Sequence, residues 1–315
     1  MNIVFVARCD YSLLTENMAS AFAQLGHEVS VFDLKKHRLQ DKYLSKGYSQ
    51  KRLKSFLNKV KPTMVFVVAP MFVSAVILDE IGNYRREQGG LLVGWIGDVF
   101  ELNDENKGKC SNFDRLYVTD SYLLTYAGLD EGAFLPLATD PALFIPNQSS
   151  RSISCSFVAS RNKNRSDFLS GVIRPIDVFG PGWKVESQQS SPHHFSLGGI
   201  SLKETAGIYA RSKIVVNLKN AVNVVNGLNQ RSFDPCAAGA VLLQDYIGDL
   251  ERHFDLESEI IVFRDAAEFE AQYDRILNDS ELTSRIATAG RRRVLNAHTY
   301  LHRAQHVTQD LDIRG

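Results

Sequence analysis

The sequence has no excess of either charge. It carries 36 basic and 36 acidic side chains, so its formal net charge at pH 7 is zero. A chain without net charge creates no long-range field that would recruit nucleic acid or an anionic membrane surface. Any site for an anion must therefore be built locally, and we expect no nucleic-acid partner.

Cysteines, targeting signals and long apolar runs are also scarce. The four cysteines are scattered without Cys-x-x-Cys spacing, which argues against a zinc site and is typical of free thiols in a reducing cytosol. The first residues lack the basic leader of a signal peptide. The most apolar stretch, Met64 to Leu78, contains Pro70 and is too short to span a bilayer. We expect a cytoplasmic protein without a transmembrane segment, and peripheral membrane association stays open.

A glycine motif is missing where one class of enzyme would need it. The first strand-to-helix turn, Arg8 to Ser12, contains no glycine. A nicotinamide or flavin enzyme needs Gly-x-Gly-x-x-Gly there so that the backbone can approach a pyrophosphate. Its absence argues against such an enzyme and leaves this turn, which contains Asp10, free to face an acceptor.

What the sequence does contain is a regular alternation of strand and helix signals. With 315 residues, of which 44% are hydrophobic, the chain is long enough for two domains of about 150 residues each. In the first half, apolar strands alternate with helices, which predicts a parallel sheet covered on both faces. The expected strands are residues 2–7, 27–32, 63–68, 91–96, 115–119 and 134–137.

A polar, proline-bearing segment from residue 138 to 152 separates this alternation from a second one. We place the domain boundary within it, which gives domains 1–145 and 146–315, and leave open that the last helix packs back on the first domain. Residues 187–199, with Ser-Ser-Pro-His-His, are interpreted as a mobile loop. The strands expected in the second half are residues 154–159, 176–179, 214–218, 240–243 and 259–263.

The most informative stretch is residues 227–243. It opens with a glycine loop, offers donors at Asn229 and Arg231, continues as a short helix with Asp234, and breaks at Gly239 before an apolar strand. Unsatisfied backbone N–H groups at a helix start suit a phosphate. The residues alone leave two interpretations open, an anion site or a packed helix in which Arg231 and Asp234 pair only with each other.

This stretch resembles the group 1 glycosyltransferases, and among them the spore-maturation CgeB-like branch. The shared pattern is Asn-x-Arg-x-Phe-Asp, a small-residue helix, glycine and an apolar strand, and it continues through residues 250–254, 259–263, 266–277, 286–290 and 298–303. The resemblance is dense over roughly the last 90 residues and looser over the first 200. It implies an α/β protein of GT-B architecture, with two Rossmann-like domains whose parallel sheets face a central cleft that holds a nucleotide-sugar.

A second candidate site is the basic loop from Ser160 to Arg165, which follows a strand and precedes a helix. A charge run is usually a solvated loop, but the carboxyl end of a strand is where open α/β sheets bind ligands. The resemblance matches Ser160 and Arg165 to a small residue and an arginine of related enzymes, and it implies that Arg165 and Arg161 bind the donor diphosphate. Lys219, just past another strand, is predicted to face the same site.

Residues 179–183 form a glycine-rich turn after a strand. Gly180 permits close approach of the backbone to a flat ring, and Trp183 offers an indole to flank a nucleobase. A tight turn with a core tryptophan is an equally open alternative. The resemblance implies that this turn lies beside the base of the donor.

The resemblance also implies roles around the helix at residue 234. Retaining members of the superfamily carry two acids eight positions apart, and the second falls on Asp234, which would hold the ribose hydroxyls. The first falls on Asn226, which is neutral. An amide still hydrogen-bonds a sugar hydroxyl or a phosphate, so Asn226 is placed with Gly227 and Asn229 in the predicted donor site.

In the first domain, Gly94-Trp-Ile-Gly-Asp98 ends a strand with an acid at its carboxyl edge. Similar family members have Trp-x-x-Asp here. Asp98 is therefore predicted as the general base for an acceptor hydroxyl if the reaction inverts, and a helix cap is the alternative. Asp10 at the first strand edge is the rival candidate.

No metal site is predicted. His193-His194 lacks a third ligand at metal spacing, and Asp310-x-Asp312 lies in the C-terminal tail. We expect a metal-independent glycosyltransferase that uses a nucleotide-diphosphate-sugar donor, needs no other cofactor, and has a glycan, a lipid-linked saccharide or a protein as acceptor. Two alternatives stay open, a nucleotide-sugar epimerase of the same fold and a non-catalytic nucleotide-sugar binding module.

Overall fold

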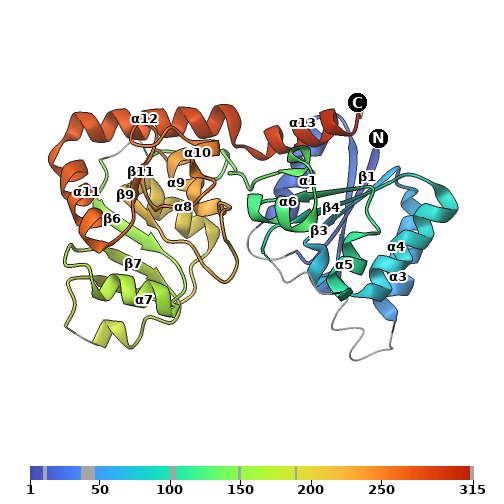
Figure 1. Cartoon of the computed structure of the whole chain (residues 1–315), viewed down its shortest axis with the longest axis horizontal. Coiled ribbons are helices and arrows are strands. Elements are labelled where there is room, and N and C mark those ends of the chain that lie inside the picture. The colour runs from blue at the N-terminus through green and yellow to red at the C-terminus, as the bar shows by residue number, and fades with distance from the viewer. Residues whose placement is uncertain (10–12, 37–46, 100–103, 148–149, 189, 313–315) are drawn as a thin grey trace. The chain divides into compact units, whose positions relative to one another are not determined.

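The chain folds into two compact α/β units in a computed structural model that describes residues 1–9, 13–36, 47–99, 104–147, 150–188 and 190–312. The first unit comprises Met1–Leu137 and Tyr300–Gly315, and the second comprises Ala138–Thr299 (Figure 1). The α/β fold with two parallel sheets, expected from the alternation of strand and helix signals, is confirmed. The sequence interpretation instead places the division at residue 145, inside the proline-bearing segment.

The first unit is a five-stranded parallel sheet with the order β2-β1-β3-β4-β5. Its register pairs Phe5 with Phe66, and Val4 with Val65. The strands are β1 (Asn2–Ala7), β2 (Glu28–Asp33), β3 (Met64–Val68), β4 (Leu91–Ile96) and β5 (Arg115–Val118). The helices are α1 (Leu14–Gln24), α3 (Tyr48–Val60), α4 (Ala75–Gln88), α5 (Asp104–Cys110), α6 (Ser121–Ala127) and α13 (Tyr300–Asp310), with 3₁₀ turns η1 (Pro70–Phe72) and η2 (Glu131–Ala133).

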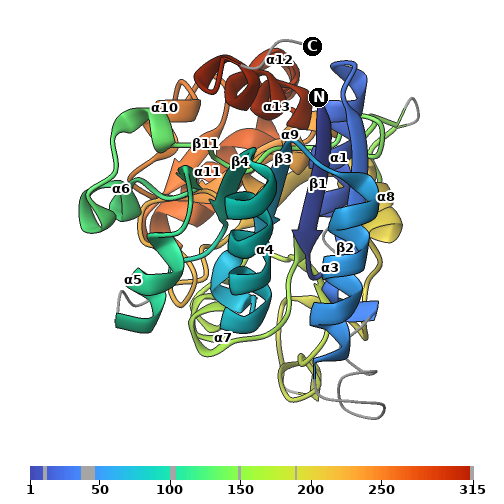
Figure 2. The same ribbon diagram turned by 90° about the vertical axis from the view of Figure 1, so that its right-hand side faces the viewer.

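Alternation along the strands sends side chains to both covered faces of this sheet. On one face, the rings of Phe5 and Phe66 stack with centroids 4.9 Å apart, and Phe22 of α1 packs on both. On the other face, Val4 and Val65 pack in a cluster with apolar residues of α3 and α4, which lie side by side (Figure 2). Continuous apolar strands are therefore what the fold requires.

The second unit is a six-stranded parallel sheet with the order β11-β10-β9-β6-β7-β8. The strands are β6 (Ile153–Val158), β7 (Asp177–Gly180), β8 (His194–Leu197), β9 (Ser212–Asn217), β10 (Val241–Asp245) and β11 (Ile261–Phe263). The helices are α7 (Lys163–Ser170), α8 (Leu202–Arg211), α9 (Asp234–Ala237), α10 (Leu250–His253), α11 (Ala266–Asn278) and α12 (Ser280–Ala297). The 3₁₀ turns are η3 (Glu186–Gln188) and η4 (Gln230–Ser232).

Two expectations about these elements are wrong. Residues 134–137 do not form a strand, since Phe134 makes only an isolated bridge to Val118. The stretch 187–199, interpreted as a mobile loop, contains β8, which pairs along β7. Its alternation was obscured by the serines and histidines, because an edge strand buries too little surface to need an apolar sequence.

Candidate functional site

Two arginines meet at the carboxyl end of β6 in the second unit. Nη1 of Arg165 donates to the carbonyl of Ser160 at 2.8 Å, and Nη1 of Arg231 donates to the carbonyl of Val158 at 3.4 Å. Arg165 is buried, with only 5% of its surface exposed, and Arg231 is half-buried. Arg165, to which the resemblance assigns the donor diphosphate, and Arg231 of the predicted anion site therefore lie at one strand end.

The arginine pair donates to carbonyl groups, and the carboxylates of Asp245 and Asp234 act on it without a direct ion pair. Within the described chain neither arginine forms an ion pair, and the buried Nε of Arg165 has no hydrogen-bond partner. Burial, and next the charge of Arg231, lower the pKa of Arg165 to about 10, while Asp245 opposes this shift. A buried cation that lacks a counter-charge is unfavourable by itself, and an anionic ligand would satisfy it.

Local sequence explains how Arg165 is held there. Asn162 caps α7, and its Oδ1 accepts the backbone N–H of Arg165 at 2.9 Å. This cap places Arg165 in the first turn of the helix, with its guanidinium 6.0 Å from the ring centre of Phe157. The helix thus directs the side chain back over the end of β6.

A buried polar network lies beside the arginines, at the ends of β9 and β10. Nδ2 of Asn217 donates to Asn229 at 3.1 Å, to Ser232 at 3.1 Å and to Gln244 at 2.7 Å. Gln244 in turn donates to Oδ1 of Asp245 at 2.6 Å. The network fixes the segment that carries Arg231, since Ser232 is the next residue along the chain.

Asp245 is the acid of this network. Its carboxylate accepts the backbone N–H of Lys219 at 3.0 and 3.1 Å. Burial raises the pKa of Asp245 to about 6, although the Lys219 N–H, Gln244 and the charges of Lys219 and Arg165 all oppose the shift. Lys219, predicted as a site cation, is thus anchored through its backbone, and its side chain is half-buried.

Asp234, predicted to hold the ribose, is buried at the start of α9. Its Oδ1 accepts the Thr139 hydroxyl at 2.7 Å. Burial raises its pKa well above the usual range, against the effect of that hydroxyl and of Arg231. The two residues form no ion pair, so the alternative in which Arg231 and Asp234 pair only with each other is wrong for this structure.

The expectation that a helix start cradles a phosphate is also wrong in detail. The helix α9 has four residues and begins at Asp234, with Pro235 next. An acidic first residue and a proline, which has no N–H group, leave little there for an anion. Gly227 is buried, and Asn226 accepts the N–H of Asp249 through its carbonyl at 3.0 Å.

Arg161 differs from Arg165. Its Nε donates to Glu186 at 2.6 Å, and Ser166 donates to the same carboxylate oxygen at 2.6 Å. Arg161 therefore already has a counter-charge on η3. Its role in binding the diphosphate stays a prediction.

The nucleobase role of the turn after β7 is corrected. Trp183 is fully buried, donates through Nε1 to the Ala159 carbonyl at 2.8 Å, and packs on Phe157 and Phe195. Gly180 has φ of +135°, and a Cβ there would lie 2.4 Å from the Ala159 oxygen. Both residues serve close packing of β7 on the loop after β6, which is the alternative that the sequence left open.

In the first unit, Asp98 lies two residues past the end of β4 and is half-buried. The carbonyl of the preceding Gly97 accepts the Thr119 hydroxyl at 2.9 Å, which ties this loop to the end of β5. Asp10, the rival candidate, lies outside the described residues.

Sequence reasoning missed Thr139, Asn217, Ser232, Gln244 and Asp245. A usable signal was present, because Asn217 and Gln244-Asp245 each end an apolar strand with polar residues. The same signal selected Asp98. Among the described residues, no group of three or more His, Cys, Asp or Glu side chains is placed to hold a metal ion, and no described helix is long and apolar enough to cross a membrane.

Part of the chain is similar to a known protein family. Residues 157–309 match the family model described as glycosyl transferase-like. No curated protein sequence matches the chain.

Solved structures share the whole architecture at low sequence identity. A glycosyltransferase from Rickettsia africae aligns with a TM-score of 0.74 at 11% identity, over 99% of each chain. A sucrose-phosphate synthase from Thermosynechococcus elongatus aligns with 0.71 at 14% identity, over 99% of this chain and 98% of that one. Anabaena HepE in complex with UDP aligns with 0.71 at 9% identity, over 99% of this chain and 100% of that one.

The fold is therefore that of the GT-B glycosyltransferases. Residues 157–309 are thus similar to a glycosyl transferase-like family, and the fold of the chain is similar to that of glycosyltransferases of known structure. The narrower placement in the CgeB-like branch stays a prediction.

The arginine pair predicts a gain of stability when one charge is removed. We expect Arg231→Gln to raise the melting temperature of the ligand-free protein by a few degrees, because Arg165 then loses a like-charged neighbour. Differential scanning fluorimetry of both proteins at low ionic strength measures this, with Arg285→Gln on the exposed face of α12 as control. A lower melting temperature for Arg231→Gln alone would contradict the electrostatic account.

Asp245 predicts a pH dependence with a defined sign. Because its pKa is higher in the folded protein than the usual 3.8, folding is favoured by the protonated form, and this contribution is lost as pH rises from about 4 through 6. Asp245→Asn has no carboxyl group that titrates at this position. Its free energy of unfolding, relative to that of wild type, should therefore increase over this range by up to roughly 3 kcal/mol. Urea unfolding of both proteins at pH 4.5, 6 and 7.5 tests this, and a pH-independent difference would refute it.

Proposed function

We propose that the protein transfers a sugar from a nucleoside diphosphate sugar to an acceptor hydroxyl, without a divalent metal. The observation that carries the proposal is the arginine pair Arg165 and Arg231, two cations at one strand end, neither of which forms a direct ion pair in the described chain. Strand carboxyl ends are where open α/β sheets bind ligands. A diphosphate would supply the direct ionic partner that neither arginine has in the described chain.

The chemistry requires charge to be absorbed as the reaction proceeds. The bond between the anomeric carbon and the diphosphate oxygen breaks, its electron pair stays on the diphosphate, and the acceptor oxygen forms the new bond and loses its proton. Arg165 and Arg231 stabilise the leaving diphosphate, a task for which other enzymes use a metal ion. Lys219 adds a third cation whose backbone is anchored on Asp245.

The polar network has a positioning role in this proposal. Asn217, Ser232 and Gln244 hold the 3₁₀ turn η4, so Arg231 is directed to the end of β6 before any ligand arrives. A preorganised donor loses little freedom when it binds, which strengthens the contact. Asp234 is proposed to orient the ribose through the carboxylate oxygen that Thr139 does not occupy.

We propose a uridine diphosphate sugar as the donor. Support comes from HepE of Anabaena, whose structures are described as complexes with UDP, with UDP and glucose, and with UDP-glucose.

Asp98, which follows the end of β4 in the first unit, is proposed as the base that takes the proton of the acceptor hydroxyl. The acceptor is proposed to be a glycan, a lipid-linked saccharide or a protein hydroxyl, and the site of the protein in the cell is proposed to be the cytoplasm.

The decisive test is titration calorimetry with UDP-glucose, in EDTA and in magnesium. Wild type should bind with the same affinity in both buffers, because arginines and not a metal neutralise the diphosphate. Arg231→Gln should weaken binding roughly 10- to 100-fold, the usual effect of losing one charge-assisted contact. The matched control Arg285→Gln, an exposed arginine on α12, should bind like wild type.

Binding that depends on magnesium would overturn metal independence, and unchanged binding by Arg231→Gln would overturn the site.

Measuring the products of turnover distinguishes the transferase from an epimerase and from a binding module. UDP release that requires an acceptor supports the transferase. Conversion of UDP-glucose to another UDP-sugar without UDP release would indicate an epimerase, and binding without turnover for every acceptor would indicate a binding module.

A further inference from the structure

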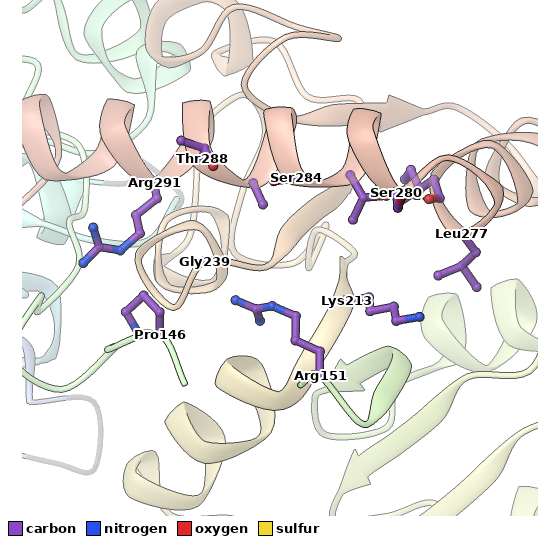
Figure 3. A pocket seen from close by; sticks show the side chains of 12 residues that line it. Pro146, Arg151, Lys213, Gly239, Leu277, Ser280, Ser284, Thr288 and Arg291 are labelled. Carbon is purple, nitrogen blue, oxygen red and sulfur yellow. Dashed lines mark hydrogen bonds between the residues drawn. The ribbon is translucent and has the colours of Figure 1, made fainter. Parts of the chain in front are cut away.

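A cavity of about 500 Å³ lies at the amino-terminal edge of the second sheet, but its cations do not meet at one point. Arg151, Lys213 and Arg291 line it. Arg151 donates to four main-chain carbonyls. Figure 3 shows the Lys213 amine and the Arg291 guanidinium at opposite ends of the cavity, pointing apart. Exposed groups that do lie together are found instead on the first unit.

Two tyrosines of α6 form an exposed, stacked pair. Tyr122 and Tyr126 are four residues apart, so they lie on one face of the helix. Their ring centroids are 5.5 Å apart, and the ring planes are inclined by only 15°. Tyr122 is 37% exposed and Tyr126 is 48% exposed. Within the described chain neither hydroxyl makes a hydrogen bond, so the pair offers an aromatic surface and two phenol groups to a ligand.

The chain holds this pair close to Asp98, the proposed base. The Thr119 hydroxyl donates to the carbonyl of Gly97, the residue before Asp98, at 2.9 Å. Asp120 then caps α6, and its Oδ1 accepts the backbone N–H of Tyr122 at 3.0 Å. The three residues from Thr119 to Tyr122 span at most about 11 Å. The first turn of α6 is therefore fixed beside the loop that carries Asp98.

An exposed ring also lies on the other side of Asp98 in the order of the strands. Phe72 ends η1, which follows β3, and it is 62% exposed. The strands β3, β4 and β5 are neighbours in the sheet, so their adjacent ends are about 5 Å apart. Met71 of η1 and Leu123 of α6 pack in one cluster with Ile96 at the end of β4. Aromatic side chains thus flank the strand end that carries Asp98.

We infer that the acceptor is a saccharide, and that Tyr122, Tyr126 and Phe72 bind it. The inference rests on the proposed sugar transfer and names the chemical class of its acceptor. A pyranose ring has faces made of C–H groups and a rim of hydroxyl groups. The faces pack on aromatic rings, which removes apolar surface from water, while the phenol groups of the tyrosines hydrogen-bond the rim.

Aromatic groups on both sides of Asp98 favour a sugar whose two faces are both apolar. In a β-linked glucose unit all ring substituents are equatorial, so each face consists of axial C–H groups. A galactose unit has one axial hydroxyl, which would be pressed against a ring without a hydrogen-bond partner. We therefore expect a β-linked saccharide of the glucose type as acceptor, in preference to its galactose counterpart or to a protein hydroxyl.

The test is saturation-transfer NMR of the full chain with cellotetraose or with the β-linked galactose tetramer, in the absence of a donor. The axial ring protons of cellotetraose should receive saturation, and the galactose tetramer should give a much weaker signal. Tyr126→Ala should weaken cellotetraose binding about tenfold, because a stacked ring is lost. Tyr126→Phe keeps the ring and should stay within about threefold of wild type.

Ile173→Ala, which truncates an exposed apolar residue of the second unit, is the control and should bind cellotetraose like wild type. Each variant should keep the melting temperature and the UDP-glucose affinity of wild type. The inference is overturned if cellotetraose receives no saturation, if Tyr126→Ala binds it as wild type does, or if the galactose tetramer binds better. An equal loss in Tyr126→Ala and Tyr126→Phe would overturn stacking. None of these outcomes bears on the donor site, whose test uses UDP-glucose and Arg231→Gln.

Discussion

The arrangement of the second unit depends on two positive charges that lie together and form no direct ion pair within the described chain. Arg165 is buried, its Nε has no partner, and Arg231 adds a like charge at the same strand end. Such a pair costs stability in the free protein. The cap on α7 and the network around Asn217 keep the two side chains there nevertheless, which is the behaviour expected of a site prepared for an anion.

The sheet of this unit offers cations at both of its edges, by different means. At the carboxyl edge, side chains at strand ends converge on the last carbonyls of β6. At the amino edge, Arg151 and Arg291 are held by carbonyls at the end of α9 and of α8. With a net charge of zero, the protein can attract anions only through such local arrangements.

Much of the fold could be predicted from the sequence, because a strand buried on both faces must be continuously apolar. β1 and β4 were predicted to the residue for that reason. β8 was missed, since an edge strand needs no such run. In the site, strand ends and arginines were visible in the sequence. The position of each side chain could not be predicted. The sequence is the same whether Trp183 is buried in the core or lies beside a nucleobase, and only the packing of the folded chain distinguishes the two.

The most direct test of the central claim is a crystal structure of the protein grown with UDP and EDTA. The account predicts that diphosphate oxygens lie within about 3 Å of guanidinium nitrogens of both Arg165 and Arg231, without an intervening metal. It also predicts that Asn217, Ser232 and Gln244 keep their hydrogen bonds, because the site is preformed. A diphosphate bound elsewhere, or bound here through a metal ion, would contradict the account.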